Sequence, residues 1–228
     1  MKKLSIYFAY PGELDTPTGG YHYDRRLIEE LRQLKVEVLA FSLPQCTLNS
    51  DSNVLRAIEH KFSLIPDHSV VLVDGLAFGV LHELANQESR RLHLIALCHH
   101  PLSFETGLLE SERAALFSSE QRALGHARAI IVTSQHTRHI LIDKFFIEPK
   151  KITVAIPGTD QVIHAPCNGN PLRLLTVASL IKRKAHDILI KSLAALSDCD
   201  WQARFVGNED LDSAWAIKLK EQVESLGL

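Results

Sequence analysis

The sequence contains little cysteine, and what it has is not arranged in pairs. Its four cysteines (Cys46, Cys98, Cys167 and Cys199) form no C-x-x-C motif. This argues against a zinc ribbon and against the disulfide framework of a small secreted protein. Cys98 and Cys199 adjoin apolar segments, so we expect both to behave as small core residues.

Net charge and long hydrophobic runs are also lacking. The 25 Lys and Arg residues nearly balance the 27 Asp and Glu residues, giving a formal net charge of −2. No global field would therefore recruit nucleic acid or an anionic membrane. No apolar run is long enough to span a bilayer. The basic start MKKLSIYFAYPGELD is interrupted by Pro11 and Gly12, so it predicts a first strand and not a signal peptide, and we expect a cytoplasmic location.

Short apolar runs alternate with longer amphipathic segments along the chain. The runs without clean polar alternation lie at 4–9, 36–43, 69–75, 92–98 and 128–134. Such runs are typical of strands buried on both faces of a sheet. A helix is predicted over 21–34, and helix candidates follow the last three runs. The alternation predicts an α/β fold with a doubly wound parallel sheet.

The composition changes at PGTDQVIHAPCNGNP, residues 157–171, which is typical of a hinge between domains. We therefore predict a first domain over 1–160, a linker over 161–171 and a second domain over 172–228. The second domain holds only two predicted strand–helix pairs, with strands at 172–178 and 201–207 and helices at about 185–197 and 212–226.

A two-stranded parallel sheet is a poor free-standing domain, because both of its edges are exposed. Either the second half docks on the first sheet, or the chain is a piece of something longer. An incomplete second sheet also predicts self-association.

The first candidate ligand loop is DTPTGGYHYDRRL, because ligands of open α/β sheets sit where strands lead into helix N-termini. Gly19 and Gly20 open the predicted helix and leave backbone N–H groups accessible to an anion. The motifs G-x-G-x-x-G and G-x-x-x-x-G-K-[ST] are missing, which weakens a dinucleotide enzyme and a P-loop enzyme as interpretations. A flexible loop that merely starts a helix is the alternative explanation.

The second candidate is the end of the strand in IALCHHPLSFETG. His99 and His100 point to opposite sides of an extended chain, so they are not expected to bind one metal ion. One of them could serve as a base or as a hydrogen-bond donor in a cleft, with Glu105 within reach. Ordinary solvated histidines at a strand end are the alternative.

The third candidate is a run of cations, Lys182, Arg183 and Lys184, between a predicted strand and a predicted helix. Cations oppose the helix dipole at an N-terminus, so these residues are not there to stabilise the helix. They suit a diphosphate ligand. A solvated surface charge run is the alternative explanation.

The order of these segments resembles the retaining glycosyltransferases of the GT-B fold, the large family that includes sucrose synthases and bacterial mannosyl- and glucosyltransferases. The motifs that carry the resemblance span the chain, and in order they are Gly19–Gly20, ALCHH with His99, IVTSQHT, PGTD, ASLIKRKAHDILI and FVGNE. The resemblance implies two Rossmann-like domains, the first complete and the second only partly present.

The resemblance also implies a function and a site. A nucleotide-sugar donor would be held by Arg183, Lys184 and the amides of Gly19 and Gly20, and His99 would lie beside the donor sugar as the catalytic residue. His100 and Glu105 would be auxiliary residues on the acceptor side. Family members need no metal and no cofactor, because cations and helix N-termini neutralise the leaving diphosphate. The partners are the nucleotide-sugar and a glycosyl acceptor, with no nucleic acid and at most weak contact with anionic lipid.

Two departures from the family pattern leave a second interpretation open. Ala178 and Ser179 replace the glycine and arginine of the motif G-R-L, and the glutamate pair of the later second domain has no counterpart. We therefore expect an N-terminal domain with only the first part of a donor domain. The alternative is a non-catalytic protein of the same ancestry that binds a sugar phosphate, a nucleotide or a protein partner.

Overall fold

A computed structural model describes residues 5–228, so the basic start and Leu4 of the predicted first strand lie outside the described residues. The chain forms two compact units, one up to Thr159 and one over Asp160–Leu228. Among residues 5–228, no helix is both long enough and apolar enough to cross a membrane.

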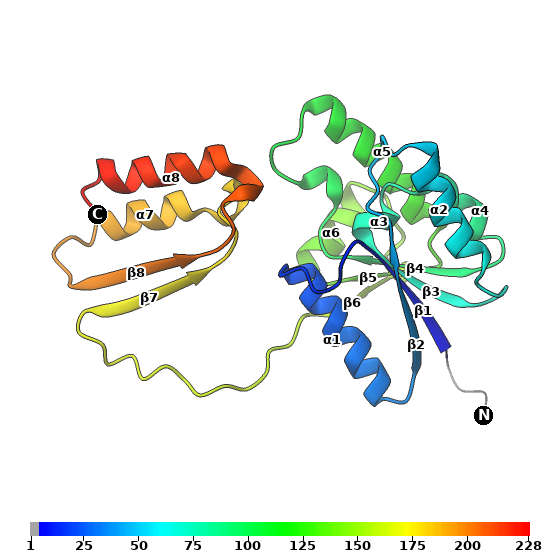
Figure 1. Cartoon of the computed structure of the whole chain (residues 1–228), viewed down its shortest axis with the longest axis horizontal. Helices are drawn as coiled ribbons and strands as arrows, with labels where there is room; N and C mark the ends of the chain where they lie inside the picture. The colour runs from blue at the N-terminus through cyan, green and yellow to red at the C-terminus, as the bar shows by residue number, and fades with distance from the viewer. Residues whose placement is uncertain (1–4) are drawn as a thin grey trace. The chain divides into compact units, whose positions relative to one another are not determined.

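The first unit is built on a six-stranded parallel sheet with the strand order β2-β1-β3-β4-β5-β6 (Figure 1). Its elements in chain order are β1 (Ser5–Pro11), α1 (Gly19–Gln33), β2 (Glu37–Leu43), α2 (Ser52–Ser63), β3 (Val70–Asp74), α3 (Gly75–Phe78), α4 (His82–Glu88), β4 (His93–Cys98), α5 (Glu110–His126), β5 (Ala129–Val132), α6 (Gln135–Asp143) and β6 (Ile152–Val154). Short 3-10 turns lie at Leu102–Phe104 and Pro149–Lys151.

Each central strand is buried on both faces, which is why its sequence is continuously apolar. In β3, Val71 and Val73 join one core cluster and Leu72 joins the other. The larger cluster holds buried residues of α2, α4, α5 and α6, and the smaller one holds Ile28 of α1. The α/β fold with a parallel sheet predicted from the sequence is therefore confirmed.

Capping side chains mark the starts of several helices. The side chains of Thr18, Asp51, Asp74 and Ser134 accept hydrogen bonds from amides in the first turns of α1, α2, α3 and α6. The sequence analysis gave no element at α2 or β6. Strand β6 is only three residues long and is defined by its pairing with β5.

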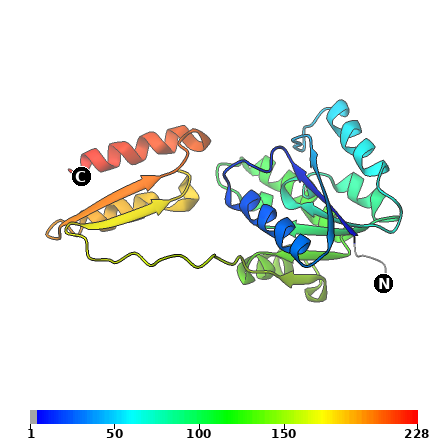
Figure 2. The same cartoon turned by 60° about the horizontal axis from the view of Figure 1, so that its bottom comes forward.

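The second unit contains β7 (Leu172–Val177), α7 (His186–Ala194), β8 (Trp201–Val206) and α8 (Ser213–Ser225). Strands β7 and β8 form a two-stranded parallel sheet, and Figure 2 shows α7 and α8 beside it. The helices bury Ile190, Leu193 and Leu219, whereas Leu175 and Val177 of β7 stay largely exposed. The segment 155–169 carries no helix or strand.

The two cysteines expected in the core have different environments. Cys98 ends β4 and is buried, but Cys199 is exposed, so that expectation was wrong for Cys199. It lies in the turn between α7 and β8, where no packed element covers it. Proximity to an apolar segment therefore did not place this side chain in the core.

Candidate functional site

The candidate site lies at the carboxyl edge of the six-stranded sheet, where β1 is flanked by β2 on one side and β3 on the other. Because α1 packs on one face and α2 on the other, the connections leave this point in opposite directions. Ligands of open α/β sheets bind at such a switch point. Asp74 ends β3, His99 directly follows β4, and Asp24 lies in α1 after β1.

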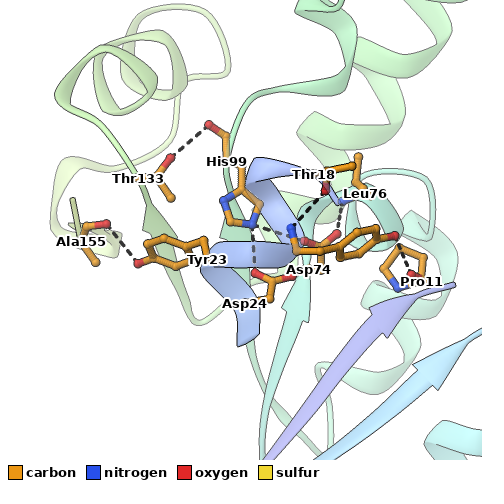
Figure 3. A network of polar contacts seen from close by, with 10 residues as sticks. Pro11, Thr18, Tyr23, Asp24, Asp74, Leu76, His99, Thr133 and Ala155 are labelled. Carbon is orange, nitrogen blue, oxygen red and sulfur yellow. Dashed lines mark hydrogen bonds and ion pairs between the residues drawn. The ribbon is translucent and has the colours of Figure 1, made fainter. Parts of the chain in front are cut away.

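His99, Asp24 and Asp74 form a compact cluster (Figure 3). The Nε2 atom of His99 donates to Oδ1 of Asp24 at 3.0 Å and lies 3.5 Å from Oδ2 of Asp74. The side chains of Asp24 and Asp74 are 0% and 1% exposed, whereas that of His99 is 22% exposed. The imidazole thus covers two buried carboxyl groups and presents its other edge to the surface.

Neighbouring groups hold the cluster in place. Oδ1 of Asp74 accepts from the backbone N–H of Leu76 at 2.8 Å, which fixes that carboxyl at the start of α3. The ring of Tyr23 packs edge-on against His99 with 5.3 Å between ring centroids, and its hydroxyl donates to the carbonyl of Ala155 (Figure 3). These contacts restrict both the histidine ring and its acidic partners.

The backbone carbonyl of His99 already accepts two hydrogen bonds. It accepts from the hydroxyl of Thr133 at 3.3 Å and from that of Thr137 at 3.4 Å. Within residues 5–228, no hydrogen bond engages Nδ1 of His99. The imidazole edge that carries Nδ1, and not the carbonyl, is therefore the group that this residue can offer to a ligand.

Contacts within the cluster shift the pKa values of His99 and Asp24. Burial alone would lower the pKa of His99, but hydrogen bonds to Asp24 and Asp74 and their negative charges outweigh it and raise the pKa to about 9. Burial and the charge of Asp74 raise the pKa of Asp24 to about 6, although the hydrogen bond from His99 opposes this shift. At neutral pH His99 is consequently an imidazolium with a donor at each ring nitrogen.

The three ligand atoms of this cluster lie within 4.8 Å of one another, close enough to hold a metal ion. A metal ion would have to displace the proton on Nε2, because imidazolium has no lone pair to donate. The raised pKa of His99 opposes that exchange at neutral pH. The prediction that the site needs no metal remains a prediction.

Gly19 and Gly20 open α1, as the sequence predicts. A Cβ atom at Gly19 would meet nothing within 4 Å, so the packing of this chain does not require glycine there. A Cβ atom at Gly20 would lie 3.5 Å from Cδ2 of His99, an ordinary contact. The structure thus brings Gly20 and His99 together and leaves open space beside Gly19 at the helix N-terminus.

The two auxiliary residues predicted near His99 have separate environments. His100 is half-buried, and its Nε2 atom is buried without a hydrogen-bond partner among the described residues. Glu105 lies in the wall of an apolar groove formed by the loops after β2 and β4. Their expected roles on the acceptor side stay predictions.

Arg183 and Lys184 lie in the second unit, in a 3-10 turn over Lys182–Lys184 that follows β7. Both side chains are exposed at this turn. Ala185 comes next with a φ of 55°, and α7 begins at the buried His186. A donor site shared by these cations with Gly19 and Gly20 stays a prediction.

Ala185 occupies left-handed backbone conformation, which costs an L residue about 1 kcal/mol. Replacing Ala185 with glycine should therefore stabilise the second unit by about 0.5–1 kcal/mol. Both tryptophans of the chain, Trp201 and Trp215, lie in this unit, so tryptophan fluorescence during urea unfolding reports its stability. The matched control is Ala194→Gly at the last residue of α7, where the backbone is helical, so glycine should destabilise the unit by up to about 1 kcal/mol. Equal shifts of the same sign would contradict the assigned backbone conformation.

Asp24 and Asp74 were missed by sequence reasoning, although each carried a usable signal. Asp74 is the last residue of an apolar strand, which is where ligand-binding side chains gather in this class of fold. Asp24 follows Gly20 by four residues, so both lie on the same face of α1. His99 was found because its strand is apolar up to the residue before it.

Comparisons with known proteins agree with this architecture. The family model described as Glycosyltransferase Family 4 matches residues 22–161, which is more than half of the chain. No curated protein sequence matches. The structure resembles a glycosyltransferase from Rickettsia africae ESF-5, with 15% sequence identity and a TM-score of 0.50, over 100% of this chain and 66% of that chain. It also resembles TarM, with 15% identity and a TM-score of 0.52, over 74% of this chain and 34% of that chain.

The chain thus spans less than two thirds of each of these two proteins. Their likeness confirms the predicted GT-B-like fold, with a complete first Rossmann-like domain and a second one partly present. The match of the family model confirms the resemblance on which the sequence analysis relied. It covers α1 from residue 22 onward, the strand that precedes His99 and the start of the segment between the two units. The chain belongs to glycosyltransferase family 4.

Proposed function

We propose that this protein transfers a hexosyl group from a nucleotide-sugar donor to an acceptor hydroxyl, with retention of anomeric configuration and without a metal ion. Membership of the glycosyltransferase family supports the reaction type. The observation that carries the proposal is the side chain of His99, which contacts two buried carboxyl groups at the carboxyl edge of the sheet. Cytoplasmic action and a role in carbohydrate biosynthesis belong to the same proposal.

The donor diphosphate is proposed to be bound by cations and backbone amides. Arg183 and Lys184 carry exposed cationic groups, and the N-terminus of α1 presents amide donors beside Gly19, where no side chain fills the space. These groups would stabilise the negative charge that develops on the leaving diphosphate. They make a metal ion unnecessary for that purpose.

His99 is proposed to position the donor sugar. Its Nε2 proton is committed to Asp24, so Nδ1–H is the donor available to a sugar hydroxyl. In the proposed reaction the bond from the anomeric carbon to the diphosphate oxygen breaks. The acceptor oxygen bonds to the same face of that carbon, and the acceptor proton passes to the leaving diphosphate.

The test uses the protein isolated from its native source, with its intact mass measured first because the relatives are longer. Release of nucleoside diphosphate from UDP-, GDP- and ADP-hexoses is then measured with and without EDTA. We expect Lys184→Ala to lower kcat/KM by about 100-fold, because one charge-stabilising donor is lost. EDTA should leave the rate unchanged.

Lys191→Ala is the matched control, since Lys191 is an exposed lysine of α7 in the same unit. Gly19→Ala should raise KM for the donor while leaving the fold intact, because its Cβ meets no protein atom. Full activity of Lys184→Ala would show that the donor-site assignment is wrong. Donor binding without turnover in the intact protein would instead favour the non-catalytic binding protein.

A further inference from the structure

An apolar groove with a volume of about 760 Å³ lies in the first unit, at the same edge of the sheet as the His99 cluster. This volume is typical of sites for small molecules. Its walls come from the end of β1, the loop over 45–49 after β2, the start of α3, and the segment over 102–116 after β4. We call it the acceptor-side groove.

The acceptor-side groove adjoins the cluster through two residues in its wall. Leu76 donates its backbone N–H to Asp74 at 2.8 Å. Tyr21 directly follows Gly20, whose Cα faces the His99 ring, and its hydroxyl donates to the carbonyl of Pro11 at 2.6 Å. A molecule lying in the groove can therefore place one end beside the residues proposed to hold the donor sugar.

The groove walls are fixed by internal hydrogen bonds. The buried carboxylate of Glu120 accepts from the backbone N–H of Leu102 at 3.1 Å, and Arg113 donates to the carbonyl of Ser103 at 2.6 Å. In the loop after β2, the N–H of Thr47 donates to the hydroxyl of Ser50 at 2.8 Å. The site is therefore largely formed before any ligand binds, which reduces the entropic cost of binding.

The side chains that line the groove disfavour a charged ligand. Leu48, Leu76, Val80, Leu102 and Leu116 provide apolar surface, and no lysine, arginine or histidine among residues 5–228 lines the groove. In the described part of the chain, the charged side chains of the lining are Glu105 and Glu112. Glu112 is exposed and its carboxylate accepts from the backbone N–H of Leu109 at 2.9 Å, so solvent screens its charge.

We propose that the acceptor-side groove binds the apolar body of an uncharged, hydroxyl-bearing acceptor and rejects anionic acceptors. The role of the bound molecule as an acceptor rests on the proposed glycosyl transfer, whereas its binding in the groove does not. An anion would lose hydration against the apolar walls without gaining a cationic partner from the described residues. A cation would gain little from Glu112, whose carboxylate is exposed and already hydrogen-bonded, or from Glu105, which already has a partner.

The test compares three probes of nearly equal shape, naphthalen-2-ylmethanol, naphthalen-2-ylmethylamine and 2-naphthoate. Binding to the full chain is measured without donor by isothermal titration at neutral pH. We expect the alcohol to bind at least about tenfold more tightly than the naphthoate. The amine should bind no more tightly than the alcohol.

The variant Leu76→Arg places a cation in the groove wall at a side chain that is 50% exposed, so the fold should tolerate it. It should weaken binding of the alcohol and strengthen that of the naphthoate, each by roughly tenfold. The matched control is Leu64→Arg, at an exposed leucine that directly follows α2 and does not line the groove. The control should change neither affinity.

The proposal would be overturned by tighter binding of naphthoate than of alcohol by the unchanged protein, or by equal effects of Leu76→Arg and Leu64→Arg. Tenfold tighter binding of the amine would also overturn it in favour of a cationic acceptor. Transfer assays separate this proposal from the proposed function. Selective alcohol binding with no transfer from any donor contradicts only the function, whereas transfer confined to anionic acceptors contradicts only the groove assignment.

Discussion

Under the proposed function, replacing His99 with alanine should lower sugar transfer by about 100-fold or more, because the group proposed to position the donor sugar is lost. The change also leaves Asp24 and Asp74 as two buried carboxyl groups without their cation. Initial rates with a nucleotide-sugar donor measure the effect on activity. His22→Ala is the matched control, since His22 is an exposed histidine on the same helix as Asp24.

His99 should also make the stability of the first unit fall as the pH rises. The pKa of His99 rises from an ordinary 6.5 to about 9 on folding, so its stabilising contribution is complete below pH 6.5 and is lost as the pH rises through 9. The loss is roughly 3 kcal/mol at most. His99→Gln removes the contribution of this histidine, and the decline of stability with pH that remains comes from Asp24, whose raised pKa destabilises the folded state as the pH rises.

Hydrogen exchange of the β3 and β4 amides, corrected for intrinsic rates, measures this stability in the first unit. Asp24→Asn should lower the pKa of His99 and move the loss of stability to lower pH, because Asp24 is its hydrogen-bonded partner. A purely structural role for His99 would leave the pH profile of transfer unchanged in Asp24→Asn. A His99→Ala variant that folds normally and keeps more than a tenth of its activity would show that the catalytic assignment is wrong.

Replacing Gly207 with alanine should destabilise the second unit by about 3 kcal/mol or more. A Cβ atom at this position would overlap the carbonyl oxygen of Ala178 and lie 3.0 Å from the backbone nitrogen of Ser179. Both contacts are to backbone, so no side chain can rotate away. The ends of β7 and β8 would have to separate where Ala178 N–H donates to the carbonyl of Val206 at 2.9 Å.

The close approach of these two strand ends also bears on function, because the chain runs from Ser179 directly into the turn with Arg183 and Lys184. We expect Gly207→Ala to weaken donor binding as well as to lower the urea midpoint followed by tryptophan fluorescence. Gly125→Ala in α5 is the matched control, because a Cβ there meets nothing within 4 Å. Unchanged tryptophan unfolding in Gly207→Ala would contradict the strand geometry described here.

Several features of this protein followed from the sequence alone because their causes are local. Strands such as β3 and β4 could be predicted because burial on both faces requires a continuous apolar run, and the break between units followed from the proline and glycine content after residue 156. The start of α1 followed from two glycines ahead of an amphipathic segment. His99 was found because ligands gather at strand ends.

Only the tertiary structure decided which residues meet. Asp24 and His99 are 75 residues apart in the chain, and their hydrogen bond exists because α1 returns across the end of β4. No local sequence pattern predicts this contact between residues so far apart in the chain. The three-residue strand β6 likewise forms only because it pairs with the edge of β5. The acceptor-side groove joins loops after β2 and β4 for the same reason. Local sequence determines the elements, whereas parallel strand pairing and helix packing bring distant side chains into one site.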